Sequence, residues 1–246
     1  MLDLPVGTAR AYWAPRSAAR DEWQALLDPG ERARRGAYLH PEDRDRFLVG
    51  AVLVRLVFAR ELSIEPAMVR LDRSCPDCER PHGKVRLAAG QSAAGGRLEV
   101  SISHSGGWVV LAACRSGAVG VDVEQITPAI DHLGVARIAF TDSESQDLSR
   151  RPPEARPAAF TRYWTRKEAV AKAVGEGLRA PLSSIEVTAP GRSPAVLSWR
   201  SRPDLAGMVQ LHDLIADDKH RASLAVISPT PVCVVEEDAV ELFGAL

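Results

Sequence analysis

Two carboxylates alternate with two valines in residues 120–124, and this pattern offers the clearest chemistry in the chain. Val121 and Val123 are β-branched and apolar, which predicts a strand with one packed face and one face carrying Asp122 and Glu124. The two carboxylates would lie roughly 6–7 Å apart along the strand. They would repel each other without a cation between them, and a hard divalent ion such as Mg²⁺ takes such oxygen ligands. A half-exposed edge strand with two ordinary surface acids fits the same pattern.

A second group of candidates lies on a helix expected over 158–175. Trp164, Glu168 and Lys172 are four residues apart and therefore share one face. Glu168 would give the metal ion a third carboxylate, and Lys167 and Lys172 would reach toward a phosphate. The chain has 27 arginines and only four lysines, so a lysine here suggests a use for its compact ammonium. The same spacing also fits a surface Glu–Lys pair beside a tryptophan that covers the core.

A third group of candidates lies at residues 101–107, where another expected strand ends. It combines serine hydroxyls, a histidine imidazole and two glycines. The Gly-x-Ser-x-Gly nucleophile elbow is absent, so a serine hydrolase is only weakly indicated. Ser103, His104 and the backbone N–H groups of the glycine turn would suit an anion site. A turn with incidental serine and histidine fits equally well.

Cys75, Cys78 and His82 have the spacing of half a zinc site. A structural zinc needs four ligands, and no second Cys/His pair follows at a typical spacing. The sequence Pro-His-Gly-Lys that ends at Lys84 is better explained as a turn that presents this lysine.

Composition excludes several classes of protein. Hydrophobic residues make up 46% and charged residues 26%, an ordinary globular balance, and a net charge of −1 provides no basic field for nucleic acid. The chain opens without a signal-peptide pattern, and no apolar run approaches the ~20 residues of a membrane span. Four cysteines in 246 residues do not resemble a disulfide framework. These features predict a cytosolic protein that binds neither nucleic acid nor membrane.

The elements that must position the candidate residues are expected in the order helices, then strands, in both halves. Helices are expected at 20–28 and 41–62, then from 128 onward with an interruption at 150–157 before the helix at 158–175. Strands are expected at 8–14, 67–71, 97–103, 108–114, 119–124, 183–188, 195–200, 207–215, 221–227 and 231–236. This order predicts two α+β units, at residues 1–118 and 119–246.

Six motifs, in this order, resemble the 4′-phosphopantetheinyl transferases of the type that activates carrier proteins of secondary metabolism. The match runs from about Pro29 to Leu178, some 60% of the chain. Its motifs are Pro41-Glu42-Asp43-(x)₂-Arg46, His82-Gly83-Lys84, Ser101-Ile102-Ser103-His104-Ser105, Gly120-Val121-Asp122-Val123-Glu124, Phe140-(x)₃-Glu144 and Trp164-(x)₂-Lys167-Glu168-Ala169-(x)₂-Lys172. Each motif alone is weak, and their common order makes the resemblance strong. The chain departs from the family at Val85, where proline is usual, and at Glu31, Arg32 and Arg34, where lysines are common.

The resemblance implies a monomer of two similar α+β subdomains in a pseudo-twofold arrangement, with coenzyme A and Mg²⁺ in the cleft between them. The implied reaction moves 4′-phosphopantetheine from coenzyme A to a serine of a carrier protein and releases adenosine 3′,5′-bisphosphate. The implied partners are the acyl or peptidyl carrier proteins of polyketide and nonribosomal peptide synthases.

The resemblance also assigns roles to residues. Mg²⁺ would be held by Asp122, Glu124 and Glu168, and Glu168 would take the serine proton. Lys172 would pair with the pyrophosphate, with Lys167 nearby. The nucleotide end of coenzyme A, including its 3′-phosphate, would be met by Arg46, Lys84, Ser103 and His104.

Two other functions fit part of the sequence. Another Mg²⁺-dependent phosphoryl-transfer enzyme, such as a phosphatase or nuclease, would use the same acids but would leave the His-Gly-Lys and Ser-His motifs without a reason. A non-catalytic zinc-binding interaction module would be built around Cys75 and Cys78, and stoichiometric zinc in the purified protein would support it.

Overall fold

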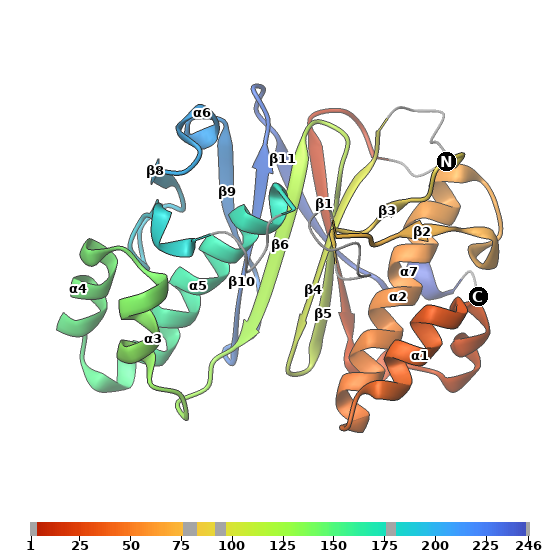
Figure 1. Cartoon of the computed structure of the whole chain (residues 1–246), viewed down its shortest axis with the longest axis horizontal. Helices are drawn as coiled ribbons and strands as arrows, with labels where there is room; N and C mark the ends of the chain where they lie inside the picture. The colour runs from red at the N-terminus through yellow and green to blue at the C-terminus, as the bar shows by residue number, and fades with distance from the viewer. Residues whose placement is uncertain (1–3, 76–82, 92–96, 176–180, 245–246) are drawn as a thin grey trace.

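The computed structural model describes residues 4–75, 83–91, 97–175 and 181–244. Two β-sheets face each other in the middle of the molecule, and helices cover the outer face of each (Figure 1). We call the first sheet with its helices the first unit, and the second sheet with its helices the second unit. The α+β class expected from the sequence is confirmed.

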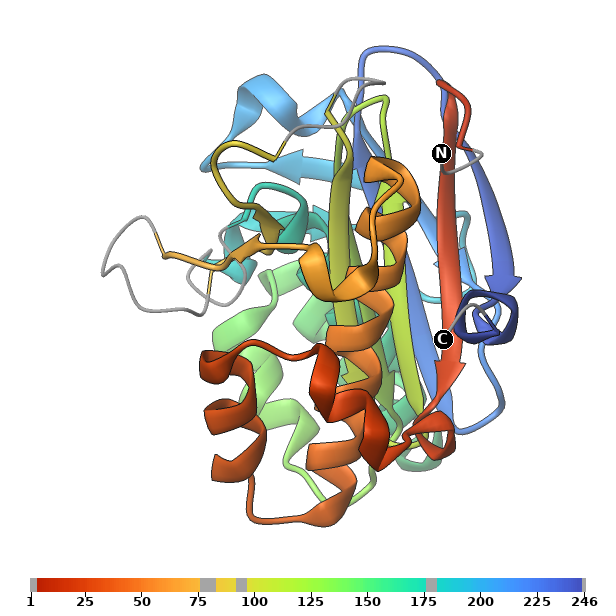
Figure 2. The ribbon, with the colours of Figure 1, turned by 90° about the vertical axis from the view of Figure 1, so that its right-hand side faces the viewer.

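The first sheet has the strand order β11-β1-β5-β4 and joins the two ends of the chain. Its strands are β1 (Thr8–Pro15), β4 (Glu99–Ser105), β5 (Trp108–Cys114) and β11 (Cys233–Asp238). β1 is antiparallel to β5 and parallel to β11, which lies beside it in Figure 2. β11 and the short helix α7 (Val240–Phe243), which fall within the unit predicted at 119–246, pack with the first sheet and its core.

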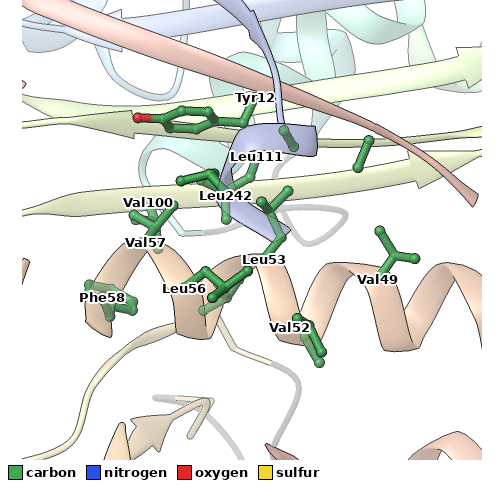
Figure 3. Close-up of a cluster of buried hydrophobic side chains, with 14 of the residues drawn as sticks. Tyr12, Val49, Val52, Leu53, Leu56, Val57, Phe58, Val100, Leu111 and Leu242 are labelled. Carbon is green, nitrogen blue, oxygen red and sulfur yellow. The ribbon is translucent and has the colours of Figure 1, made fainter. Parts of the chain in front are cut away.

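Helix α2 (Pro41–Leu62) covers the first sheet and has the bounds expected from the sequence. Pro41 occupies its first turn, and two acids there complement the helix dipole. Its apolar side chains pack against strand residues such as Val100 and Leu111 and against Leu242 of α7 (Figure 3). This packing forms the larger of the two cores that lie beneath helices.

Helix α1 (Pro29–Ala37) precedes α2 and begins with a capping box, in which Asp28 and Glu31 accept each other's backbone N–H. The expected helix at 20–28 is a 3₁₀ segment, Asp21–Leu26, and the true helix starts after Asp28. The expected strand at 67–71 is also wrong. It is replaced by a 3₁₀ turn, Pro66–Met68, and by β2 (Leu71–Asp72), which pairs with β3 (Arg86–Leu87) over two residues.

The second sheet has the order β6-β10-β9 and is antiparallel throughout. Its strands are β6 (Ala118–Gln125), β9 (Val209–Leu214) and β10 (His220–Ile227), and its covering helices are α3 (His132–Ala139), α4 (Asp142–Arg150) and α5 (Arg156–Ala173). β7 (Ile185–Val187) and β8 (Val196–Trp199) form a separate hairpin, and α6 (Pro203–Ala206) follows it. A third core of small and branched residues, among them Ala112, Val121 and Leu224, fills the space between the two large sheets.

Gly120 lets α5 lie directly on β6. A Cβ at this position would overlap the carbonyl oxygen of Ala169 and the backbone nitrogen of Ala173. We expect Gly120→Ala to push α5 away, to lower the free energy of unfolding by about 1–3 kcal/mol, and to reduce activity. Urea unfolding tests this expectation against Gly36→Ala, where a methyl group meets no described atom within 4 Å. Equal stability of the two variants would contradict it.

None of the described helices is both long enough and apolar enough to span a membrane.

Candidate active site

A cleft of about 420 Å³ opens between the two units. Six of the predicted site residues line it: Ser103, His104, Asp122, Glu124, Glu168 and Lys172. The rest of the wall includes Arg34, Tyr38, Phe47, Arg73, Ile102 and Trp164. The face shared by Trp164, Glu168 and Lys172 on α5 therefore points into the cleft, as their spacing predicts.

Alternate serines of β4 attach the first unit to β6 of the second. Their hydroxyls lie on the same side of the strand because side chains alternate along it. The hydrogen bonds join Ser101 Oγ to Val121 N at 3.1 Å, Ser103 Oγ to Asp122 Oδ1 at 2.8 Å and Ser105 Oγ to Glu124 Oε2 at 2.7 Å. Both acids of the Asp-x-Glu pair are thus held from the opposite unit.

Lys172 lies against the most buried of these acids. Its Nζ is 2.6 Å from Asp122 Oδ1 and 2.9 Å from Ser103 Oγ. The side chain of Asp122 is 2% exposed, whereas that of Lys172 is 26% exposed. The ammonium thus neutralises a buried carboxylate while remaining accessible from the cleft.

Two glutamates in the cleft are poised to gain or lose a proton near neutral pH. Burial, followed by the neighbouring charge of Asp122, raises the pKa of Glu168 from 4.5 to about 7. The same two causes raise the pKa of Glu124 to about 7, against the opposing effects of the Ser105 hydrogen bond and Lys172. The three carboxylates carry more negative charge than Lys172 alone can balance.

The donor set suits a hard divalent cation, although the side chains are not gathered around one. Asp122 Oδ2 and Glu168 Oε1 are buried and have no hydrogen-bond partner among the described residues. Carboxylate oxygens are the ligands that Mg²⁺ prefers. Within the described ranges, however, no group of three or more acidic, histidine or cysteine side chains is arranged to hold a metal ion as it stands. The ammonium of Lys172, rather than a metal ion, lies against Asp122 in this structure.

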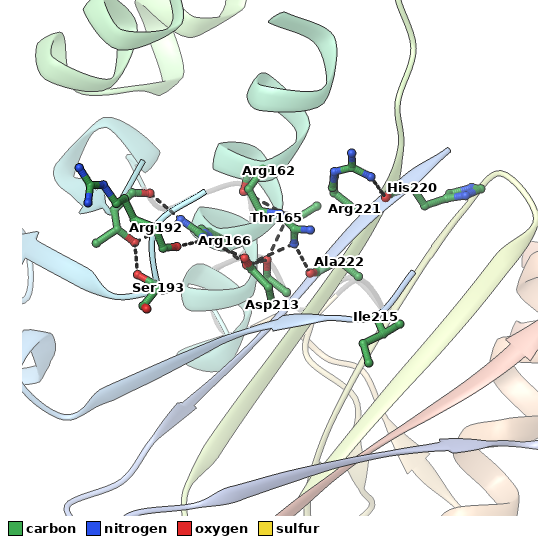
Figure 4. A network of polar contacts seen from close by, with 12 residues as sticks. Arg162, Thr165, Arg166, Arg192, Ser193, Asp213, Ile215, His220, Arg221 and Ala222 are labelled. Carbon is green, nitrogen blue, oxygen red and sulfur yellow. Dashed lines mark hydrogen bonds and ion pairs between the residues drawn. The ribbon is translucent and has the colours of Figure 1, made fainter. Parts of the chain in front are cut away.

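Two arginines of α5 attach it to the strands of the second unit (Figure 4). The guanidinium of Arg166 is fully buried and bonds both carboxylate oxygens of Asp213, at 3.0 and 2.7 Å, together with carbonyl groups of residues 188–192. Arg162, one turn earlier, bonds the carbonyl of Ala222 at 2.6 Å. These contacts hold the helix that carries Glu168 and Lys172 at a fixed register on β9 and β10.

His104 lies at the end of β4, with Arg46 near it. Although its side chain reaches the surface, the protein around it excludes water and lowers the pKa of His104, and the charges of Arg46 and Lys172 lower it further. Arg46 donates to the Gly106 carbonyl at 2.7 Å and pairs with Asp43, so it lies beside the cleft rather than in the wall described above.

Comparison with known proteins shows which family the chain is similar to. Residues 118–225 match the family model of the 4′-phosphopantetheinyl transferase superfamily, and residues 11–116 match that of the 4′-phosphopantetheinyl transferase N-terminal domain. The 4′-phosphopantetheinyl transferase HetI of Nostoc sp. is 32% identical over 212 residues, which are 86% of this chain and 83% of the relative. The chain belongs to the 4′-phosphopantetheinyl transferases.

Other transferases share similar identity. The phosphopantetheinyl transferase of Thraustochytrium sp. is 32% identical over 88% of this chain and 75% of its own, and Sfp of Bacillus subtilis is 29% identical over 68% of each. Among solved structures, holo-[acyl-carrier-protein] synthase of Thermotoga maritima is similar at 21% identity and a TM-score of 0.37, covering 47% of this chain and 64% of that one. The Helicobacter pylori synthase in complex with coenzyme A is 15% identical with a TM-score of 0.36, covering 45% and 99%.

Lys167, which was expected near the pyrophosphate, does not line the cleft. Its side chain is fully buried, pairs with Glu144 and lies 5.1 Å from the centre of the Phe140 ring. Burial lowers the pKa of Lys167 by more than the charge of Glu144 raises it. Lys167 and Glu168 are neighbours in sequence, but one helical step of about 100° separates their directions.

Lys84 is also placed differently from the expectation. Its Nζ bonds Glu99 at 2.8 Å and the Ala173 carbonyl at 3.0 Å, and it lines a second pocket of about 440 Å³ rather than the cleft. Only its neighbour Gly83 reaches the cleft wall. Of the possible zinc ligands, Cys75 is a buried free thiol, and Cys78 and His82 lie outside the described residues.

The cationic and aromatic wall of the cleft was not recognised in the sequence as a unit. Arg73 follows β2 and is held by Glu31 at 3.3 Å, while Arg34 lies 5.5 Å from the centre of the Phe47 ring. The departure at Glu31, Arg32 and Arg34 from the usual lysines was the one sequence signal that pointed to arginines in this part of the cleft.

Proposed function

We propose that this transferase moves 4′-phosphopantetheine from coenzyme A to a serine hydroxyl of an acyl or peptidyl carrier protein, with Mg²⁺ as cofactor. The serine oxygen attacks the phosphorus that carries pantetheine, and the bond from that phosphorus to the bridging pyrophosphate oxygen breaks. Adenosine 3′,5′-bisphosphate leaves. Family membership supports the transfer itself. The observation that carries the proposed mechanism is the pair of unpartnered buried oxygens of Asp122 and Glu168 in the cleft wall.

Asp122, Glu124 and Glu168 would hold the metal ion through their carboxylate oxygens. Bound there, Mg²⁺ would neutralise the charge that develops on the leaving group. Glu168 would also take the proton of the attacking serine, since its unpartnered Oε1 lies in the cleft wall. The ammonium of Lys172, accessible from the cleft, would pair with the pyrophosphate.

The other side of the cleft would bind the nucleotide. Arg34 and Arg73 line it, and guanidinium groups bind phosphate oxygens through paired N–H donors. Ser103 and His104 also line the cleft, and Arg46 would reach the 3′-phosphate from the rim. Lys84 and Lys167 do not line this cleft and pair with Glu99 and Glu144 instead.

The natural partner would be a carrier domain of a polyketide or nonribosomal peptide synthase. This choice is supported by the resemblance of the motifs and by relatives such as Sfp. We also propose that the transferase is a monomer and that it acts in the cytoplasm. The cytoplasmic location is suggested by its four cysteines, which do not resemble a disulfide framework.

Intact-mass spectrometry of an apo carrier protein tests the proposed reaction. Incubation with the transferase, coenzyme A and Mg²⁺ should add one phosphopantetheine to the carrier, and EDTA or Asp122→Ala should abolish the gain. Asp142→Ala, at an exposed position of α4, should leave it unchanged.

The other outcomes separate the parts of the proposal. A gain that persists in EDTA would contradict the metal requirement. Failure on several types of carrier, with no measurable binding of coenzyme A, would contradict the transfer and favour another phosphoryl-transfer reaction.

A further inference from the structure

The turn between β4 and β5 directly follows His104 and Ser105, so its position affects theirs. Gly106 and Gly107 form its two-residue loop, and Ser105 is paired with Trp108 across it. Gly106 has a φ of +55°, a left-handed conformation that glycine adopts without steric cost. Ser105 in turn holds Glu124 and accepts the N–H of Gln125 at 3.0 Å.

This hairpin turn is contacted from the second unit by residues 217–220, where the connection that follows β9 enters β10. Asp217 uses both carboxylate oxygens: Oδ2 accepts the indole N–H of Trp108 at 3.0 Å, and Oδ1 lies 2.7 Å from His220 Nδ1. The same Oδ1 accepts the backbone N–H of Lys219 at 2.9 Å. One side chain therefore ties the 217–220 turn together and ties it to the hairpin.

His220 also packs against the hairpin turn, at Gly106. Its side chain is buried, and its Nε2 occupies the space that a side chain on Gly106 would need. That nitrogen has no hydrogen-bond partner in the described parts of the chain. The imidazole therefore acts as a wall against which the glycine turn packs, oriented by Asp217 through its other nitrogen.

On the opposite side, the hairpin is held by the first unit. Arg46 donates to the Gly106 carbonyl at 2.7 Å, and the N–H of Arg16 donates to the Gly107 carbonyl at 2.8 Å. The turn is thus clamped between the two units, and its two glycines leave it little stiffness of its own.

We infer that Asp217 and His220 are positioning residues for the transfer reaction, acting through Trp108 and Gly106 on the hairpin that holds His104 and Ser105. This inference rests on the proposed function and extends it to residues that do not line the cleft. Loss of the clamp would let Ser105 move, and Glu124 would lose the hydroxyl that orients it. Outer partners of this kind change the activity or metal affinity of a site by roughly 10–100-fold.

The test compares Asp217→Asn with Asp218→Asn, a neighbouring exposed acid that is not one of the carboxylates holding the turn. Trp108→Phe provides a second route, since it removes the indole donor but keeps an aromatic ring. We expect Asp217→Asn and Trp108→Phe to lower kcat/KM for carrier modification by about tenfold or more, at a temperature where both are fully folded. Asp218→Asn should match the wild type.

A second readout does not depend on activity. Amide hydrogen exchange of residues 104–108 should become faster in Asp217→Asn, while exchange in α2 and α5 stays unchanged. A double variant with Ser105→Ala should lose less than the product of the two single losses, because both changes release Glu124.

Faster exchange with an unchanged kcat/KM would overturn the inference, since the clamp would then serve stability alone. Unchanged exchange in both variants would overturn it as well. Failure of the proposed function is recognised separately, because the wild type itself would then modify no carrier.

Discussion

Replacing Glu168 by glutamine is expected to lower kcat for carrier modification by about 10³-fold. The amide cannot accept a proton from the attacking serine, and a positioned general base contributes roughly 10²–10⁴-fold to such reactions. The change also removes a negative charge from the proposed metal site. Steady-state kinetics at saturating coenzyme A and Mg²⁺ measure this effect.

The same substitution is expected to stabilise the metal-free protein at high pH. Burial and Asp122 raise the pKa of Glu168 to about 7, so between pH 4.5 and 7 the folded state holds a proton that the unfolded state releases. Stability contributed by this proton is therefore present below pH 4.5 and is lost as the pH rises through 7. At pH 8 the buried charge costs on the order of 3 kcal/mol, which glutamine avoids.

Urea unfolding in EDTA at pH 5 and pH 8 measures this cost. The stability of Glu168→Gln relative to wild type should be near zero at pH 5 and clearly positive at pH 8. Glu154→Gln, at an exposed position, is the matched control and should show no pH-dependent difference. A variant that keeps the wild-type rate, or one that gains no stability at pH 8, would contradict the role given to Glu168.

Replacing Lys167 by methionine is expected to lower the free energy of unfolding by about 3–5 kcal/mol. Its partner Glu144 is 2% exposed and also accepts the backbone N–H groups of Val187 at 2.8 Å and Thr141 at 2.9 Å. Without the ammonium, a carboxylate would remain buried and uncompensated. Chemical denaturation measures the loss, and adding Glu144→Gln should restore much of it.

Lys172→Met provides the contrasting case. It should weaken coenzyme A binding, measured by calorimetry, far more than Lys167→Met does in its folded state. Coenzyme A binding that is weakened by Lys167→Met, with stability unchanged, would return Lys167 to the phosphate contact expected from the sequence.

Local patterns predicted those parts of the site that a single element determines. The alternation at residues 120–124 predicted β6 with its two acids, and the four-residue spacing predicted the face of α5 that carries Glu168 and Lys172. The helix at 41–62 was predicted to the residue because proline begins it and a long apolar face sustains it.

Features that depend on contacts between distant segments were not predictable in this way. The pairing of β11 with β1 joins residues more than two hundred positions apart, and no local signal distinguishes it from pairing within the second unit. The resemblance assigned Lys84 and Lys167 to phosphates, yet each pairs with a carboxylate that is distant in the sequence, Glu99 and Glu144. Arg73 lines the cleft while paired with Glu31, a residue from a distant part of the sequence.

The parallel pairing of the first and last strands also determines how the molecule responds to force. A pull on the two ends of the described chain draws the start of β1 and the end of β11 in opposite directions along their common axis. The hydrogen bonds between them are then loaded together in shear, and none can be opened first as in a zipper. The β1–β11 pair should therefore act as a mechanical clamp that resists unfolding by machines pulling on either end.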